Sequence, residues 1–527
     1  MKRLIATLLA VLTLAAVLAG CSTQAETVPA QEATAAPAPT EAPAQETPAQ
    51  QEPEAPAAPK YVFLFIGDGM SYPQIQSTAD YLGAQRDPET YLLANTSVKE
   101  HQGAILAGPS ALNFMNFEAA GSAVTYDSNS FCPDSASTAT SISTGHKTYS
   151  GTINMDETGS VAYETIAEKL HAQLGMKIGV ISSVNLNHAT PAAFYAHQAS
   201  RNSYYEIGLE LIDSGFEYFA GGGLLKPNGA DGDKDNLYDL AAAAGYTVIN
   251  TQAEAANAQG DKLILIDENL ADADAMAYEL DRTDDMWALS DYVAKGIEVL
   301  DNENGFFMMC EGGKIDWACH ANDAASTIQD TVALTDAVQV AIDFAAQHPD
   351  ETLILVTGDH ETGGLTIGFA GTNYDTYLTL LQSQKISFAK YDSDYVAAYK
   401  ENNTPFEDVL ADIEALFGLK SEGAEDDRLV LTPYELQQLK TAYEKSIAGE
   451  ETGMDAQQEY VLYGTYEPLT VTITHVLNSK SGVSFTSYSH TGLPVAVLAD
   501  GVGAEAFNGY YDNTDIYNKL AALLNIA

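Results

Sequence analysis

The sequence predicts a three-layer α/β/α sandwich, in which helices cover both faces of a central, mostly parallel sheet. The predicted strands are four short apolar runs, Tyr61–Ile66, Lys177–Ser183, Phe306–Cys310 and Thr352–Thr357. Helical patterns lie between the runs, and each run leads into a segment that carries Gly, Asp or His. Apolar strands that alternate with helices are typical of a parallel sheet buried on both faces. Functional groups of such a sheet gather at the carboxyl ends of its strands.

Three helical patterns supply the predicted outer layers. They span Tyr163–His171, Met286–Leu300 and Asp323–Ala346, and a further strand is predicted at Val495–Ala499. From about residue 366 to 480 the alternation lapses and helices dominate. This stretch lies between candidate site residues, so we expect an insertion near the functional edge of the sheet that acts as a lid or a dimer contact. An independent module is the alternative.

Within this stretch, the sequence predicts where two helices begin and where one of them ends. Thr404 and Thr432 each begin a Thr-Pro-x-Glu sequence, which is typical of a capping box with Pro at the first helical position. Gly418 is suited to ending the first of these helices.

The chain begins with the pattern of an export signal. Lys2 and Arg3 precede an apolar run from Leu4 to Leu18, which leads into Ala19-Gly20-Cys21. This order resembles the lipobox of bacterial lipoproteins, in which Cys21 would be lipidated and residues 1–20 removed. A plain signal peptide and a short membrane anchor are the alternatives.

A tether is predicted to follow the lipidated cysteine, over residues 21–59. Its composition is almost wholly Ala, Pro, Glu, Gln and Thr, which cannot offset the entropy cost of ordering. The folded domain is therefore expected at residues 60–527, held outside the cytoplasm at the cell surface or in the periplasm by a lipid anchor in the membrane.

The composition excludes a nucleic-acid-binding protein. The 527 residues include 24 Lys and Arg against 73 Asp and Glu, a formal net charge of −49. Nucleic-acid affinity depends mainly on neutralising phosphates with basic side chains, so no nucleic-acid partner is expected. The hydrophobic content of 46% is that of a globular protein.

A candidate nucleophile lies in the segment Asp134–Thr140, where a helix could begin at Ser135. A hydroxyl at that position would face unpaired backbone N–H groups and the positive end of the helix dipole, which suits an anionic substrate. Serine needs a base or a metal to become a nucleophile. By itself the segment is more typical of a helix N-cap.

Side chains of the types that bind metal ions follow several predicted strands, which favours a catalytic role for this edge of the sheet. Asp316 and His320 are spaced to share one face of a helical turn, from which two ligands can reach one ion. Asp359-His360 adds an oxygen and nitrogen pair directly after a predicted strand. Three further candidate ligands of the same kind are Asp68, Glu311 and His490.

These residues lie in motifs that together resemble those of the alkaline phosphatases, along most of the chain from Lys60 to Ala527. The segments are Ile66-Gly67-Asp68-Gly69-Met70, Asp134-Ser135-Ala136-Ser137-Thr138-Ala139-Thr140, Ser143-Thr144-Gly145, His188-Ala189-Thr190-Pro191-Ala192-Ala193, Ser200-Arg201, Glu311-Gly312-Gly313-Lys314-Ile315-Asp316, His320-Ala321, Thr357-Gly358-Asp359-His360-Glu361 and His490-Thr491-Gly492. All of them follow the order of the family.

The resemblance implies two zinc ions and a third metal, usually magnesium. By this resemblance, one zinc would be held by Asp316, His320 and His490. The other zinc would be held by Asp68, Asp359 and His360. The third metal would be held by Asp68, Thr190 and Glu311.

The resemblance also implies a reaction. Ser135, activated by one zinc, would attack phosphorus and form a phosphoserine, which water activated at the other zinc would hydrolyse. Arg201 would hold two phosphate oxygens with its planar fork, a geometry that Lys does not supply. The substrates would be small phosphomonoesters, and the family is usually a homodimer.

Two positions depart from the pattern of many bacterial members. His188 stands where they have Asp, and a nitrogen ligand there suits zinc or cobalt better than magnesium at the third site. Trp317 stands where they have a Lys that contacts phosphate through water, so we expect weaker retention of product phosphate. Simple packing of Trp317 under the insertion is an equal alternative.

The favoured hypothesis is therefore a surface-anchored phosphomonoesterase with a broad substrate range. A phosphodiesterase or a sulfatase of the same superfamily is a second hypothesis, although the sulfatase Cys-x-Pro-Ser-Arg type of context is absent around Ser135. A third is a non-catalytic surface lipoprotein that binds zinc or phosphate. Such a protein would need no nucleophile, which argues against it.

Overall fold

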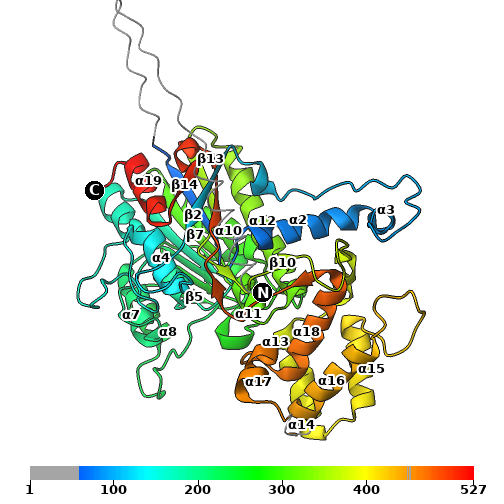
Figure 1. The fold of residues 1–527 in the computed structure, drawn as a ribbon. Helices are drawn as coiled ribbons and strands as arrows, with labels where there is room; N and C mark the ends of the chain where they lie inside the picture. The colour runs from blue at the N-terminus through cyan, green and yellow to red at the C-terminus, as the bar shows by residue number, and fades with distance from the viewer. Residues whose placement is uncertain (1–57, 448, 450–452) are drawn as a thin grey trace, which may run out of the picture. The chain divides into compact units, whose positions relative to one another are not determined.

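A ten-stranded sheet forms the centre of the fold in the computed structural model, which describes residues 58–447, 449 and 453–527 (Figure 1). The strand order is β14-β2-β13-β8-β1-β7-β3-β4-β6-β5. Strand β13 runs antiparallel to both of its neighbours, whereas the other neighbouring pairs of this sheet are parallel. The predicted mostly parallel sheet is confirmed.

The described strands and helices have the following bounds. The strands of the central sheet are β1 (Tyr61–Gly67), β2 (Ala119–Val124), β3 (Lys177–Ser182), β4 (Tyr218–Gly221), β5 (Thr247–Ile249), β6 (Leu263–Ile266), β7 (Phe306–Gly312), β8 (Thr352–Gly358), β13 (Val495–Gly501) and β14 (Gly509–Asp512). Two small pairs consist of β9 (Glu361–Thr362) with β12 (His490–Thr491) and β10 (Thr366–Ile367) with β11 (Val483–Ser484). The α-helices are α2 (Tyr72–Arg86), α3 (Pro88–Leu93), α4 (Ser135–Thr144), α5 (Ile166–Lys169), α6 (Ala189–Ala192), α7 (Tyr204–Ser214), α8 (Leu237–Ala243), α9 (Gln252–Asn257), α10 (Leu289–Leu300), α11 (Lys314–His320), α12 (Ala324–Ala345), α13 (Phe388–Tyr391), α14 (Ala397–Asn402), α15 (Phe406–Phe417), α16 (Pro433–Ser446), α17 (Ala456–Tyr463), α18 (Pro468–Ser481) and α19 (Thr514–Leu524).

Both faces of the sheet are buried, which explains why its strands read as continuous apolar runs. In β1, Val62, Leu64 and Ile66 join one apolar cluster, with residues of α4, α7 and α19. The alternate residues of β1, such as Phe63 and Phe65, join a second cluster with residues of α2, α10 and α12. Figure 1 shows these two groups of helices on opposite sides of the sheet. The three predicted layers are therefore present.

Helices dominate between β10 and β11, where α13 to α18 group together (Figure 1). They enclose an apolar cluster of their own, with Ile413 of α15, Leu439 of α16 and Ile473 of α18. Tyr81 of α2 and Ile328 of α12 belong to the same cluster, so this group of helices packs directly against the helices that cover the sheet.

Some predicted helix bounds were wrong by a few residues. The first predicted helix begins at Ile166, after the N-cap Thr165, and continues beyond Lys169 as a π-helical turn. The second begins at Leu289 rather than Met286. Thr432 caps α16 through a capping box as expected, but α15 begins at Phe406 with Pro405 as its N-cap, because Pro405 keeps an extended backbone.

The described residues belong to one compact unit, Pro56–Ala527. The predicted signal peptide, the lipidated Cys21 and the predicted tether up to residue 57 lie outside the described residues. Within residues 58–447, 449 and 453–527, no helix is both long enough and apolar enough to cross a membrane.

Candidate active site

The register of the central strands brings their polar ends to one edge of the sheet. Gly67 at the end of β1 is paired with Gly312 of β7 on one side and with Gly358 of β8 on the other. Asp68 and Asp359 directly follow these strand ends. The strand-end residues singled out from the sequence are therefore brought close together.

Ser135 is the first residue of α4 and is 1% exposed. Asp134 caps this helix, because its side chain accepts a hydrogen bond from the backbone N–H of Ser137 at 3.1 Å. The Ser135 Oγ lies 3.2 Å from Nε2 of His360, a predicted metal ligand. The predicted helix start at Ser135 is confirmed, and its hydroxyl lies at the positive end of the helix beside the candidate metal site.

Arg201 is held on two sides beside Ser135. One guanidinium nitrogen donates to Oδ2 of Asp134 at 2.8 Å, and the other donates to Nε2 of His188 at 3.0 Å. Burial opposes the charge of Arg201, but Asp134 outweighs it, so the pKa of Arg201 is raised above its ordinary value. Asp134 thus links the cap of α4 to the candidate phosphate-binding side chain.

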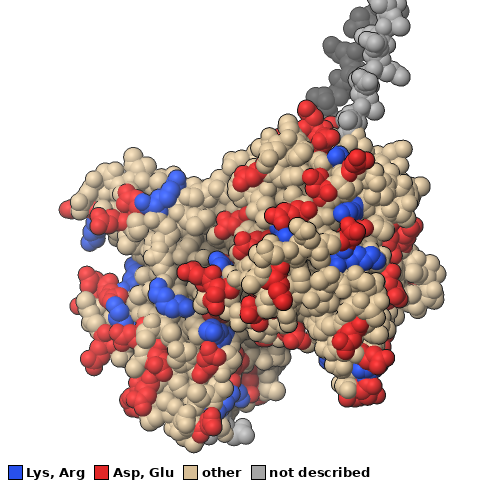
Figure 2. Space-filling view, turned by 180° about the vertical axis from the view of Figure 1, so that it is seen from behind, with Lys and Arg blue, Asp and Glu red and all other residues tan. Residues whose placement is uncertain are grey.

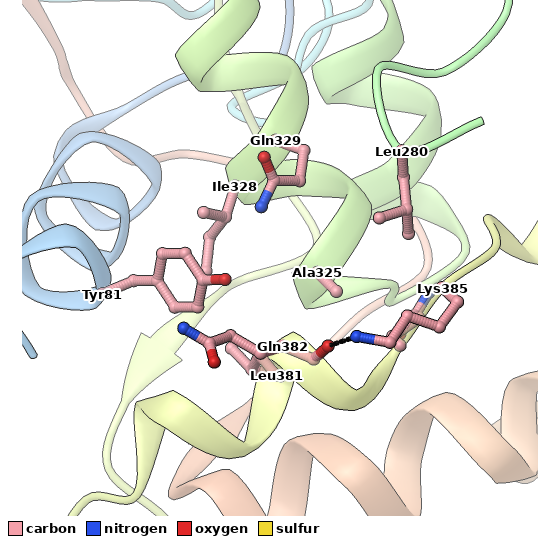
Figure 3. A pocket seen from close by; sticks show the side chains of 9 residues that line it. Tyr81, Leu280, Ala325, Ile328, Gln329, Leu381, Gln382 and Lys385 are labelled. Carbon is pink, nitrogen blue, oxygen red and sulfur yellow. Dashed lines mark hydrogen bonds between the residues drawn. The ribbon is translucent and has the colours of Figure 1, made fainter. Parts of the chain in front are cut away.

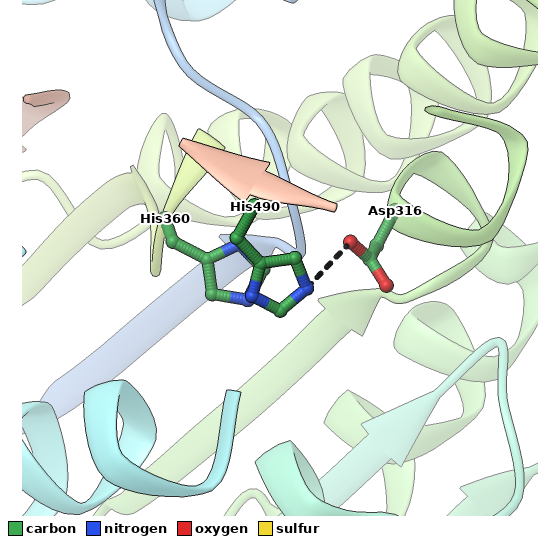
Figure 4. Close-up of side chains that lie close together, drawn as sticks. All are labelled: Asp316, His360 and His490. Carbon is green, nitrogen blue, oxygen red and sulfur yellow. Dashed lines mark ion pairs between the residues drawn. The ribbon is translucent and has the colours of Figure 1, made fainter. Parts of the chain in front are cut away.

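Two groups of candidate metal ligands share His360, whose Nε2 lies beside the Ser135 hydroxyl. One group is Asp316, His360 and His490, in which His490 Nε2 lies 3.6 Å from Asp316 Oδ1 (Figure 4). His320, the remaining predicted ligand, has its Nε2 3.1 Å from that of His490 and 3.4 Å from Asp316 Oδ2. The imidazole of His360 stacks on His490 with centroids 3.6 Å apart, so His360 adjoins both predicted zinc sets.

The second group consists of Asp68, Asp359 and His360, as predicted for the other zinc. All three residues are fully buried, and His360 Nε2 lies 3.4 Å from Asp68 Oδ1 and 3.3 Å from Asp359 Oδ2.

Backbone carbonyl groups orient the imidazoles of His320 and His490. Nδ1 of His320 is 2.6 Å from the Tyr488 carbonyl, and Nδ1 of His490 is 2.5 Å from that of Pro133. These contacts leave each Nε2 facing the carboxylates.

A third group consists of Asp68, His188 and Glu311. Each contributes a buried atom, Asp68 Oδ1, His188 Nδ1 and Glu311 Oε1, that has no hydrogen-bond partner within the described chain. Buried polar atoms without partners are costly, and a bound cation would satisfy the three together. The Thr190 hydroxyl donates to Asp68 Oδ2 at 3.3 Å, which places Thr190 beside this group. The residues present therefore fit a metal ion at the predicted third site.

Electrostatics favour a cation at this edge of the sheet. Burial, together with the charge of Asp316, raises the pKa of Asp359 to about 8. Burial likewise raises the pKa of Glu311 to about 7, and that of Asp68 rises well above its ordinary value. Asp316 differs, because its neighbours His320 and His490 outweigh burial and hold its pKa well below the usual range. A bound dication would stabilise the charged forms of these crowded carboxylates.

A cavity of about 360 Å³ opens beside Ser135 and some of the candidate metal ligands. Its lining includes the sequence-predicted residues Ser135, His188, Arg201, Asp316, Trp317, His320 and His490. Asp272, Phe388 and Tyr466 also line it and were not predicted. Phe388 and Tyr466 come from the helical segment between β10 and β11, where no motif in the sequence distinguishes them from packing residues.

A second cavity of about 380 Å³ lies between α2, α12 and the short helix Leu378–Ser383 (Figure 3). Among the described residues that line it, including Tyr81, Gln329 and Lys385, none is Asp, Glu or His. The candidate metal-ligand groups are thus associated with the first cavity.

The fold and the site define the class of this protein. It is a three-layer α/β protein with a buried serine, an arginine and candidate metal-ligand groups at the carboxyl edge of a mostly parallel sheet. This arrangement is typical of enzymes that combine metal ions with a serine nucleophile.

Comparison with known proteins narrows the class to a family. The family model for alkaline phosphatase matches residues 59–526, and the chain belongs to the alkaline phosphatase family. It is accordingly a metal-dependent phosphomonoesterase. Alkaline phosphatase 4 of Bacillus subtilis is 30% identical over 398 residues, which cover 74% of this chain and 76% of that protein. Alkaline phosphatase 3 of the same organism is 29% identical over 466 residues and 87% of each chain.

Solved structures support the same family. A cold-active alkaline phosphatase from Shewanella sp. is 27% identical, with a TM-score of 0.68, and the match covers 88% of this chain and 99% of that one. A mutant of TAB5 alkaline phosphatase, in which a His is replaced by Glu and Mg is bound in the M3 site, is 25% identical. Its TM-score is 0.57, with 89% of this chain and 99% of that chain covered.

Proposed function

We propose that this protein hydrolyses phosphate monoesters outside the cytoplasm through a phosphoserine at Ser135. The observation that carries the proposal is that Ser135 and Arg201 line one cavity together with the candidate metal ligands His188, Asp316, His320 and His490. The remaining ligand groups adjoin this site through His360, whose Nε2 lies 3.2 Å from the Ser135 hydroxyl. Asp316, His320 and His490 would hold one zinc, and Asp68, Asp359 and His360 the other.

A third metal would be held by Asp68, Thr190, Glu311 and His188. We propose magnesium there, with zinc or cobalt as the alternatives, because His188 brings a nitrogen ligand to an otherwise oxygen-rich group. The TAB5 mutant, which has Glu in place of a His and binds Mg in its M3 site, is consistent with a His that affects which metal is bound.

When bound, the zinc ions would lower the pKa of hydroxyl and water ligands and stabilise negative charge on the phosphoryl oxygens. Ser135 attacks phosphorus from the first turn of α4, where the helix dipole favours an anionic group. Arg201 binds two phosphate oxygens through the guanidinium that Asp134 positions. Hydrolysis of the phosphoserine then releases inorganic phosphate.

Because the protein is strongly acidic, binding of an anionic substrate depends on positive groups within the site itself. Figure 2 shows acidic side chains spread over the face of the molecule that it presents, with fewer basic ones between them. With a formal net charge of −49, the chain as a whole repels a phosphate dianion. Arg201, the end of α4 and bound cations would supply the attraction at the site itself.

The proposal extends to location and assembly. Residues 1–20 would be a lipoprotein signal peptide, and Cys21 would carry the lipid that anchors residues 60–527 to the membrane through the tether. Residues 366–480 would form the insertion, and the enzyme would act as a homodimer.

The experiment is a comparison of the zinc- and magnesium-loaded enzyme with Ser135→Ala, using a chromogenic aryl phosphate. We expect the variant to lose more than a thousandfold in kcat, because the nucleophile is missing. Ser128→Ala is a matched control, since the Ser128 hydroxyl donates to Glu157 at the surface. Acid quenching followed by peptide mass spectrometry should find one phosphate on Ser135. Hydrolysis of an aryl phosphate diester or an aryl sulfate in its place would contradict the proposal.

A further inference from the structure

Three aromatic rings line the active-site cavity beside the catalytic groups. Trp317 comes from α11, Phe388 is the first residue of α13, and Tyr466 lies in the turn before α18. We call these three residues the aromatic wall. None of them belongs to the candidate metal-ligand groups, and the mechanism above uses none of them.

Hydrogen bonds and ring contacts fix the aromatic wall in place. The backbone N–H of Phe388 donates to Oδ2 of the buried Asp323 at 3.0 Å. The Phe388 ring packs edge-on against Tyr466 at 5.9 Å and against the buried Tyr278 at 5.5 Å. Phe388 and Tyr466 are thus supported by each other and by buried neighbours, and support of this kind reduces the entropy cost of binding.

Lys314 and Asp272, which lie beside the wall, are paired with each other. Lys314 Nζ lies 4.7 Å from the centroid of Trp317 and 3.9 Å from that of Tyr278, and it donates to Asp272 at 2.8 Å. A cationic leaving group such as choline would compete with Lys314 both for the ring of Trp317 and for the Asp272 carboxylate. A neutral, planar ring does not compete for the Asp272 carboxylate and gains by contact with aromatic side chains such as Phe388 and Tyr466.

We propose that the aromatic wall is the subsite for the leaving group, and that the enzyme prefers phosphate monoesters in which this group carries a neutral aromatic ring, such as nucleoside 5′-monophosphates. This inference rests on the proposed function, because Ser135 and Arg201 must hold the phosphoryl group. Water supplies the hydroxyl of the released phosphate and the proton of the leaving nucleoside. The ring takes no part in bond breaking and contributes binding alone.

The test compares AMP with ribose 5-phosphate on the full chain loaded with zinc and magnesium. Both substrates have the same primary alcohol as leaving group, so the ratio of their kcat/KM values isolates the contribution of the base. We expect this ratio to be about ten, in line with the binding that base stacking on an aromatic side chain contributes. Equal kcat/KM values, or faster hydrolysis of choline phosphate than of AMP, would overturn the inference.

Variants locate the preference. Phe388→Leu and Tyr466→Leu keep apolar side chains but remove the rings, and each should bring the ratio towards one. Tyr434→Leu, at a side chain that is 72% exposed and outside this cavity, should keep the ratio of the wild type. If Phe388→Leu and Tyr466→Leu both keep it as well, the aromatic wall is not the subsite.

Calorimetry separates the inference from the proposed function. If AMP, ribose 5-phosphate and the aryl phosphate are all left intact, the proposed function fails, whereas the affinities of AMP and ribose 5-phosphate for metal-loaded Ser135→Ala still test the aromatic wall. AMP that binds about tenfold more tightly supports the subsite, and equal affinities overturn it.

Discussion

Replacing His197 with Gln should destabilise the protein near neutral pH and have little effect at pH 10. Nε2 of His197 is 3.3 Å from Glu168, and Nδ1 is 3.4 Å from Glu210. Burial opposes protonation, but the hydrogen bonds and charges of the two carboxylates outweigh it and raise the pKa of His197 to about 10. This histidine lies four residues before Arg201 in the chain, and its ion pairs fix that segment to the helices that carry Glu168 and Glu210.

The size of the effect follows from the pKa difference. A rise from the ordinary value of about 6.5 to about 10 corresponds to about 5 kcal/mol. The side chains of His197, Glu168 and Glu210 are 19%, 31% and 27% exposed, so we expect solvent screening to reduce the contribution to about 2 kcal/mol. Because the folded-state pKa is raised, this stabilisation is complete below pH 6.5 and is lost as the pH rises to about 10.

Urea unfolding followed by circular dichroism, at pH 6 and at pH 10, measures the effect. The difference in free energy of unfolding between wild type and His197→Gln should be about 2 kcal/mol at pH 6 and close to zero at pH 10. His348→Gln is the control, because its pair with Glu351 at 3.4 Å is at the surface, where the side chains are 33% and 49% exposed. A loss of the same size at both pH values would show that His197 acts through packing and refute the ion-pair reasoning.

Three further predictions concern the site. Trp317→Lys should lower the inhibition constant of product phosphate about tenfold, because it adds a positive charge beside the phosphate position; an unchanged constant from steady-state kinetics would count against this placement. His188→Asp should raise the magnesium content of the purified enzyme relative to zinc, since oxygen ligands suit magnesium; elemental analysis showing the same ratio as wild type would contradict a ligand role. Removing the metals by chelation should abolish activity and lower the Tm, because buried carboxylates such as Asp68 and Asp359 would then repel one another. Calorimetric scans before and after readdition of zinc and magnesium measure this, and an unchanged Tm would be the opposing result.

The sequence was sufficient to predict five strands of the sheet, β1, β3, β7, β8 and β13, and the strand-end residues at its functional edge, whereas β2, β4, β5, β6 and β14 were not predicted. Strands such as β1 and β8 are apolar on both faces, and each ends at a Gly-Asp pair, so pattern alone locates the strand and the side chain that follows it. The helix at Ser135 could be predicted for a similar reason, because Asp134 is a favourable N-cap.

The features of the site that could not be predicted depend on contacts between segments that are distant in the chain. Phe388 and Tyr466 reach the cavity because the helical segment packs on α2 and α12, and no local pattern encodes that contact. The bond from Arg201 to Asp134 joins two loops and likewise leaves no signal in either one. Helix starts such as Phe406 in place of Pro405 were predicted less well, since Pro405 can occupy either the cap or the first turn.

The place of the aromatic wall in the chain has a consequence for the evolution of substrate preference. Two of its three rings lie in the segment between β10 and β11, whereas the candidate metal ligands lie on strands of the sheet or directly after them, at the start of α6, on α11 and on β12. Substitutions in that segment can therefore alter which substrates are accepted while the phosphoryl-transfer groups stay the same. Related proteins that share this sheet can therefore acquire different substrate ranges through changes in one peripheral segment. Exchanging that segment between relatives is a direct route to enzymes with new substrate ranges.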